Sequence, residues 1–142
     1  MNTRQIYCCG CNGEVAARLT NGAEIYPHRG DLHSLKFWKC DGCGDAVGCH
    51  KSGSKGTRPL GVIANREIKN WRMKIHAKLD PLWKQKAFSR KSLYSSISKR
   101  MGIEAYHTAE LTTVADCQKV LSILDDLEQW AVNNRGYKVV QS

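Results

Sequence analysis

Four cysteines in two CxxC pairs are the residues of this sequence best suited to chemistry. Cys8 pairs with Cys11 and Cys40 with Cys43, and 28 residues separate the two pairs. Two residues between the cysteines of a pair let both thiolates face one ion from a tight turn, and four such thiolates hold Zn²⁺ tetrahedrally. The pattern therefore predicts one structural zinc ion held by two knuckles.

Other uses of four thiols are open from the residues alone. Four thiolates can also hold an iron–sulfur cluster, and a single CxxC pair can act as a redox dithiol. A redox dithiol is disfavoured because no βαβ pattern surrounds either pair. Zinc is preferred over an iron–sulfur cluster because the ribbon-like context is structural. The seven cysteines of the chain favour metal binding over disulfides, since an odd number cannot be fully paired.

The remaining cysteines and two histidines are expected to lie outside the metal centre. Cys9 stands between two ligands and should point away from the ion, and Cys117 falls on an apolar helical face. The Cys49–His50 pair could replace a ligand or form a second partial site, although four better-spaced cysteines already satisfy zinc. His28 and His33 are expected to face solvent from a loop.

The net charge of +9 is concentrated in the middle of the chain. Residues 51–100 hold fourteen Lys or Arg against Glu67 and Asp80, net +12, whereas residues 1–50 net 0 and residues 101–142 net −3. This density exceeds what solubility requires and favours DNA or RNA phosphates as the partner. The strongest candidates for phosphate contact are Arg58, Arg66, Lys69, Arg72, Lys74, Lys84, Lys86, Arg90 and Lys91.

The knuckles and cations require two kinds of elements to position them. Residues 14–20 and 34–39 mix apolar and polar side chains and are interpreted as strands of a small ribbon. The pattern predicts an α+β protein with a zinc ribbon at 1–50, a basic Gly/Ser-rich linker at 51–61, and a helical unit of about four helices at 62–142.

Helical spacing and capping residues locate the expected helices. The first presents one apolar face, interpreted as buried core, that comprises Ala64, Ile68, Trp71, Ile75 and Leu79. Asp80–Pro81 suits a helix start, so we expect a corner there and a second short helix after it. Ser89 can cap a third helix that ends at Gly102, and Thr113 a fourth that ends by Gly136.

Catalysis and membrane insertion are both disfavoured. His76 and Asp80 lie one helical turn apart and could form an acid/base or metal pair, yet Asp80 is also explained as a cap. Because no nucleophile elbow, phosphate loop or HExxH motif occurs, the protein is not expected to be an enzyme, with nuclease activity as the alternative. No run approaches the roughly 18 apolar residues of a membrane span and no signal peptide is visible, so we expect a cytoplasmic protein.

The combination of motifs resembles a family of zinc-finger-containing proteins common in phages and other mobile genetic elements. The resemblance covers most of residues 7–103, with a weaker likeness through the Cys117 helix. Its motifs are Tyr7, Cys8 and Cys11, then Cys40 and Cys43, residues 47–50 and 58–61, and His76 followed by residues 80–84. It implies a zinc finger followed by helices in a mobile-element setting, and it brings no established activity.

These observations lead to two functional hypotheses. The first is a phage or mobile-element accessory protein whose zinc ribbon is structural and whose basic helical region binds DNA or RNA. The alternative is a protein-interaction factor that docks on a host complex, such as a nuclease, polymerase or ribosome, because a basic surface also suits acidic protein partners.

Overall fold

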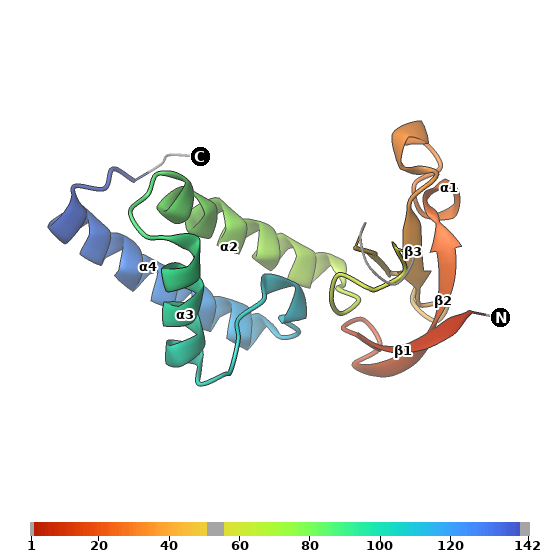
Figure 1. The fold of residues 1–142 in the computed structure, drawn as a ribbon. Coiled ribbons are helices and arrows are strands. Elements are labelled where there is room, and N and C mark those ends of the chain that lie inside the picture. Colours follow the sequence, from red (N-terminus) through yellow and green to blue (C-terminus); the bar gives the residue numbers. More distant parts are fainter. Residues whose placement is uncertain (1, 51–55, 140–142) are drawn as a thin grey trace. The chain divides into compact units, whose positions relative to one another are not determined.

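The chain forms two compact units, residues 1–67 and residues 68–142, here called the ribbon unit and the helical unit. The structure, a computed structural model, describes residues 2–50 and 56–139. Figure 1 shows the elements of both units.

A four-stranded antiparallel sheet forms the ribbon unit, with its strands in the order β1-β2-β3-β4. The strands are β1 at Thr3–Cys8, β2 at Gly13–Asn21, β3 at Lys36–Lys39 and β4 at Ala46–Gly48. A short helix, α1 at Gly22–Ile25, follows β2, and the Asn21 side chain caps it by accepting a hydrogen bond from the Glu24 backbone N–H. The expected strands at 14–20 and 34–39 are therefore confirmed as β2 and β3, whereas β1 and β4 were not predicted.

The core of the ribbon unit combines both hairpins with a segment from beyond the sheet. Leu60 donates a backbone hydrogen bond of 2.9 Å to Gly48, and Ile63 donates one of 2.8 Å to Tyr7. Residues 58–63 thus bond to both β4 and β1, and Ile63 is fully buried. Part of the expected linker, residues 51–55, lies outside the described residues. The buried cluster comprises Ile6, Cys8, Ala17, Trp38, Cys40 and Ile63.

Three long helices build the helical unit: α2 at Arg66–Lys84, α3 at Arg90–Met101 and α4 at Val114–Arg135. α2 and α4 lie side by side in Figure 1, and ion pairs from Lys78 on α2 to Asp125 and Glu128 on α4 join them. Their buried apolar side chains are Ile68, Ile75, Leu79 and Leu82 of α2, Leu93 and Ile97 of α3, and Cys117, Val120, Ile123, Leu124, Leu127 and Ala131 of α4.

The expected helix ends agree with the structure at both caps and both glycines. Ser89 Oγ accepts a hydrogen bond of 3.1 Å from the Ser92 N–H, and Thr113 Oγ1 accepts one of 3.1 Å from the Asp116 N–H. Gly102 closes α3 with φ of 74° and Gly136 closes α4 with φ of 63°, in the left-handed region that favours glycine. These signals are local, so they could be recognised without the tertiary structure.

Two expectations about α2 were wrong. The helix does not turn a corner at Asp80–Pro81 but continues through Pro81 to Lys84. Ile75, Leu79 and Leu82 are all fully buried, so burial of one apolar face outweighs the penalty of a proline in the last turn of the helix. Trp71, expected in the core, is half-buried, and the Lys74 ammonium lies 4.6 Å from its ring centroid.

No helix in the part of the chain that the structure describes combines the length and the apolar character that a bilayer crossing demands.

Candidate metal centre and basic surface

The two knuckles lie at hairpin ends of the sheet. β1 ends at Cys8 and β2 begins at Gly13, so the first knuckle occupies the turn between them. The second occupies the turn between β3 and β4, where the Gly44 N–H donates to the Cys40 carbonyl over 2.7 Å. The antiparallel order of the strands therefore brings two turns that are distant in sequence to one metal centre.

The four sulfur atoms meet the geometric requirement of a tetrahedral zinc site. The Sγ atoms of Cys8, Cys11, Cys40 and Cys43 all lie within 4.8 Å of one another. Across the knuckles, Cys8 and Cys43 are 3.4 Å apart and Cys11 and Cys40 are 3.6 Å apart. Four thiolates about 2.3 Å from a central Zn²⁺ would be about 3.8 Å apart, so these cysteines fit one structural zinc ion.

The surroundings of the cysteines explain why a cation is needed. Burial raises the pKa of the Cys8 thiol, and the hydrogen bond with the Cys40 sulfur raises the pKa of the Cys11 thiol. Burial also raises the pKa of the Cys43 thiol, whereas hydrogen bonds from its surroundings outweigh burial and lower the pKa of the Cys40 thiol. Ionisation of three of the four thiols is thus opposed, and a bound Zn²⁺ would displace their protons and compensate the negative charge of the thiolates. A side chain at Gly10 would crowd this arrangement, because its Cβ would lie 3.3 Å from Cys43 Sγ.

An ion-pair cluster links the second knuckle to β2. Arg18 donates from Nε and Nη2 to the two carboxylate oxygens of Asp41, over 3.0 and 2.9 Å. Asp41 lies between the ligands Cys40 and Cys43, and the Arg18 hydrogen bonds lower the pKa of its carboxyl group. Because both side chains are largely exposed, the pair orients the knuckle more than it stabilises the unit.

The other cysteines lie outside the four-cysteine cluster. Cys9 is buried, and its backbone N–H donates to the Ile63 carbonyl over 2.8 Å. Cys117 is fully buried in the helical core, as expected. Cys49 and His50 are half-buried beyond β4, and the metal-binding group that the described residues form does not include them.

The expected phosphate-binding residues belong to both units. Arg58 and Arg66 fall in the ribbon unit, and the remaining seven fall in the helical unit. Six of those seven are exposed, and within residues 56–139 none of the six forms an ion pair with a carboxylate. These six residues, here called the basic set, are Lys69, Lys74, Lys84, Lys86, Arg90 and Lys91.

Arg72, the seventh, has a structural role that sequence patterns did not indicate. It is half-buried, and its Nη2 donates hydrogen bonds of 2.8 Å to both the Ala109 and the Leu111 carbonyls. These acceptors lie in the connection between α3 and α4, so the guanidinium ties that connection to α2. This role could not be predicted from the sequence, because it depends on which segment of the chain packs against α2.

The Arg72 interaction leads to a stability prediction. We expect Arg72→Met to lower the free energy of unfolding by about 1–3 kcal/mol, because two carbonyls lose a charged donor. Lys69→Met on the exposed face of α2 should change it by less than about 0.5 kcal/mol. Urea unfolding followed by circular dichroism measures both, and equal effects of the two substitutions would contradict the structural role.

Aromatic side chains hold several cations in place. The Arg90 guanidinium carbon lies 5.4 Å from the Trp83 ring centroid and 5.0 Å from that of Tyr94, and Lys84 lies 5.6 Å from Trp83. Such contacts fix the direction of a cation without neutralising it. Lys78 differs, because its charge is directed at carboxylates of α4.

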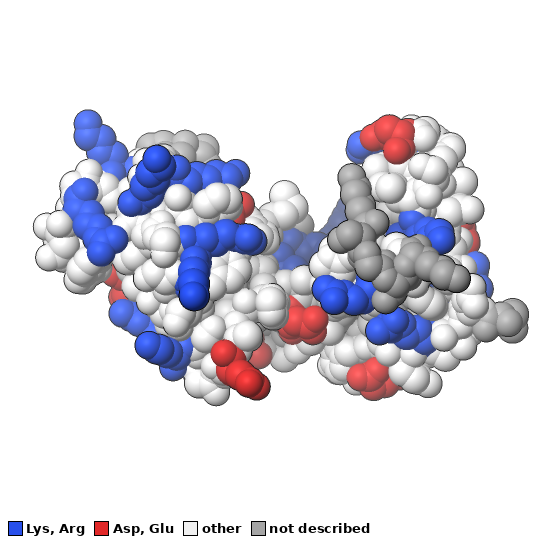
Figure 2. All heavy atoms as spheres, in the orientation of Figure 1, with Lys and Arg blue, Asp and Glu red and all other residues white. Residues whose placement is uncertain are grey.

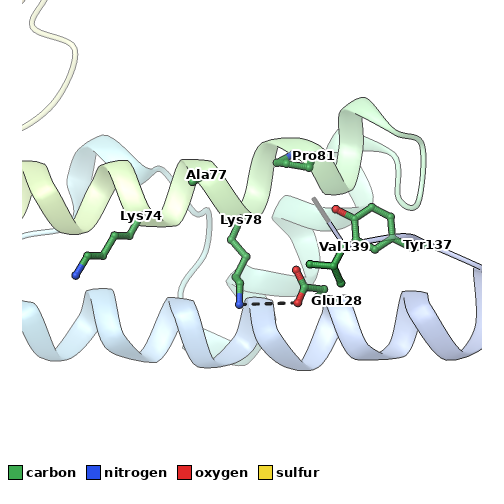
Figure 3. A pocket seen from close by; sticks show the side chains of 7 residues that line it. All are labelled: Lys74, Ala77, Lys78, Pro81, Glu128, Tyr137 and Val139. Carbon is green, nitrogen blue, oxygen red and sulfur yellow. Dashed lines mark ion pairs between the residues drawn. The ribbon is translucent and has the colours of Figure 1, made fainter. Parts of the chain in front are cut away.

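A groove of about 270 Å³ between α2 and α4 is lined by Lys74, which belongs to the basic set, and by Lys78, which does not. In Figure 3, Lys78 reaches across the groove toward Glu128, with 3.8 Å between Nζ and Oε1, while Lys74 extends from an earlier turn of α2. Tyr137 and Val139 line the same groove. Lys78 therefore joins two helices and is not counted in the basic set.

His76 and Asp80 form a local contact on α2. His76 Nδ1 lies 3.4 Å from Asp80 Oδ1, and the same oxygen accepts a hydrogen bond of 3.3 Å from Trp83 Nε1. The spacing of one helical turn accounts for this arrangement.

The fold and the cysteine geometry define a zinc-ribbon protein with a separate helical unit. The comparison with protein families agrees: a family described as a zinc-finger-containing domain matches residues 4–127. The chain belongs to this zinc-finger-containing domain family, and the match includes all four proposed ligands. No curated protein and no solved structure gives a significant match to this chain.

Proposed function

We propose that the protein binds DNA or RNA through the basic set of the helical unit, with the zinc ribbon as a structural module. The setting that we propose is the one implied by the sequence resemblance, an accessory role in a phage or other mobile element. Phosphates are the ligand that exposed, uncompensated cations suit best, and contacts to phosphate carry no base sequence.

The supporting observation is the segregation of charge within the helical unit. Residues 68–101 carry ten Lys or Arg against one acidic residue, Asp80, net +9, whereas α4 carries two against four, net −2. Figure 2 displays Lys and Arg side chains spread over the viewed face of the helical unit, with acidic side chains mainly toward its lower edge. This excess of positive charge is larger than solubility requires, and its electrostatic field attracts polyanions.

A salt titration tests this proposal. If all six cations of the basic set contact phosphates of duplex DNA, the slope of log affinity against log salt should be about −5. Lys69→Glu and Lys91→Glu should each flatten the slope by about 1 and weaken all sequences in parallel. Fluorescence anisotropy of labelled DNA and RNA at several salt concentrations measures both quantities.

Lys119→Glu on α4 is the matched control, since it makes the same charge change at an exposed residue outside the basic set. Equal effects of Lys119→Glu and Lys69→Glu would mean that net charge alone governs binding. No binding to DNA or RNA at low salt would reject the proposal and favour docking on an acidic surface of a host protein complex. Release of labelled fragments from DNA or RNA with Mg²⁺ would instead indicate a nuclease.

A further inference from the structure

A hollow of about 280 Å³ lies in the helical unit where α2 and α4 end. Three of its lining residues are exposed cations, Lys86, Arg135 and Lys138, and within the part of the chain that the structure describes no carboxylate lines it. The residues that line it are Gln85, Lys86, Ala87, Arg135, Gly136, Tyr137 and Lys138. Convergence of three positive charges on one small concave space suits a phosphate group.

Helix ends explain only part of this charge. Cations are common in the last turn of a helix, where they offset the negative end of the dipole, and Arg135 occupies such a position. Lys86 instead follows α2 and has φ of 62°, a conformation that glycine adopts without strain and lysine does not. The backbone conformation of the turn therefore does not explain why this residue is a lysine. A binding site that needs a positive charge at this position would explain it.

Arg135 is held in a fixed direction at the edge of the hollow. Its Nη1 donates to the Ala87 carbonyl over 2.5 Å, which uses one of the five N–H donors of the guanidinium. Its guanidinium carbon lies 5.4 Å from the Phe88 ring centroid and 5.0 Å from that of Trp130. A cation held in this way meets a ligand with little further loss of conformational entropy.

Trp130 places an aromatic surface beside the hollow. It stacks on Phe88, with ring centroids 5.7 Å apart and planes inclined by 29°, yet 45% of its surface is exposed. An exposed indole next to a guanidinium suits the two parts of a nucleotide, because a guanidinium can bind the phosphate and an indole can stack on the base. Bases of an intact duplex are already stacked on each other, so the match is to an unpaired strand.

We propose that this hollow binds a backbone phosphate of single-stranded nucleic acid through Lys86, Arg135 and Lys138, with a neighbouring base stacked on Trp130. The inference rests on the proposed function and adds to it a preference for single strands at one end of the helical unit.

Anisotropy titrations with a labelled single-stranded oligonucleotide and a duplex of the same sequence test it on the full zinc-bound chain. Lys86→Gly with Lys138→Gln removes two cations and relieves the strained backbone, so the variant should fold. Its salt slope for the single strand should be flatter by about 1.4 than that of the parent. Lys99→Gln with Lys119→Gln removes two exposed cations outside the hollow and should leave the slope unchanged, as Lys119 lies about 24 Å along α4 from Arg135.

Substitutions of Trp130 test the stacking. Trp130→Leu should weaken single-strand binding by about five-fold or more and leave duplex binding unchanged, whereas Trp130→Phe should retain most of the affinity because it keeps an aromatic face. Circular dichroism of each variant identifies any loss of folding. Trp130→Phe makes the result interpretable even if Trp130→Leu disturbs the contact with Phe88.

Several outcomes would overturn the inference while nucleic-acid binding itself stands. One is an equal loss in the hollow variant and in the Lys99/Lys119 control, and another is a loss confined to the duplex. A third concerns competition for the bound strand. If inorganic phosphate displaces the strand as effectively as unlabelled oligonucleotide does at equal phosphate content, the hollow is a site for free anions. If neither nucleic acid binds at low salt, the proposed function fails as well.

Discussion

Cys40→Ser is expected to release the zinc ion and unfold the ribbon unit. Among the described residues of this unit the buried cluster comprises six side chains, two of which are ligands, so the metal contributes a large part of the folding free energy of the unit. Structural zinc sites in small modules supply on the order of 10 kcal/mol, and losing one of four thiolates forfeits most of it. Serine keeps the size of the side chain, which separates loss of coordination from loss of packing.

Zinc content and tertiary structure measure the two parts of this result. Elemental analysis should give one zinc ion per chain for the parent and near zero for Cys40→Ser. Trp38 lies in the ribbon core with 5% of its surface exposed, so its fluorescence should shift to longer wavelength when that core opens. The far-ultraviolet signal of α2, α3 and α4 should persist if the helical unit folds without the ribbon.

Cys9→Ala and Cys49→Ala are the matched controls. Both residues are cysteines near the ligands, and neither belongs to the cluster of sulfurs within 4.8 Å of one another. We expect both variants to retain one zinc ion. Loss of metal from Cys9→Ala as complete as that from Cys40→Ser would contradict the ligand assignment, as would a parent protein that carries no zinc.

The second large effect is expected in the core of the helical unit. Leu79→Ala should lower the free energy of unfolding by about 2–5 kcal/mol, because Leu79 is fully buried on α2 and its truncation leaves a cavity. Each kcal/mol should lower Tm by about 4–8 °C for a unit of this size. Thermal unfolding followed by circular dichroism measures the shift.

Met73→Ala is a comparison on the same helix. Met73 is 70% exposed, so its truncation should change the free energy of unfolding by less than about 0.5 kcal/mol. If Met73→Ala destabilises the protein as much as Leu79→Ala, the assignment of buried and exposed faces of α2 is incorrect. If Leu79→Ala is neutral, this part of α2 does not pack in the core.

Short-range patterns in the sequence were sufficient to identify the metal centre and most helix ends. A CxxC pair brings its two sulfurs together through a single turn, and the caps at Ser89 and Thr113 act within three residues of themselves. Such interactions depend on neighbouring residues alone. The same is true of Gly102 and Gly136, whose positive φ reflects the absence of a side chain.

Tertiary structure decided the features that depend on residues far apart in the chain. α2 passes through Pro81 because Leu82 is buried beyond it, and Arg72 leaves the candidate phosphate contacts because the connection after α3 supplies its acceptors. Lys86 and Arg135 converge only because α2 and α4 end at the same place. Composition shows that the middle of the chain is basic, but burial and pairing decide which cations are available, and both arise only when distant segments pack together.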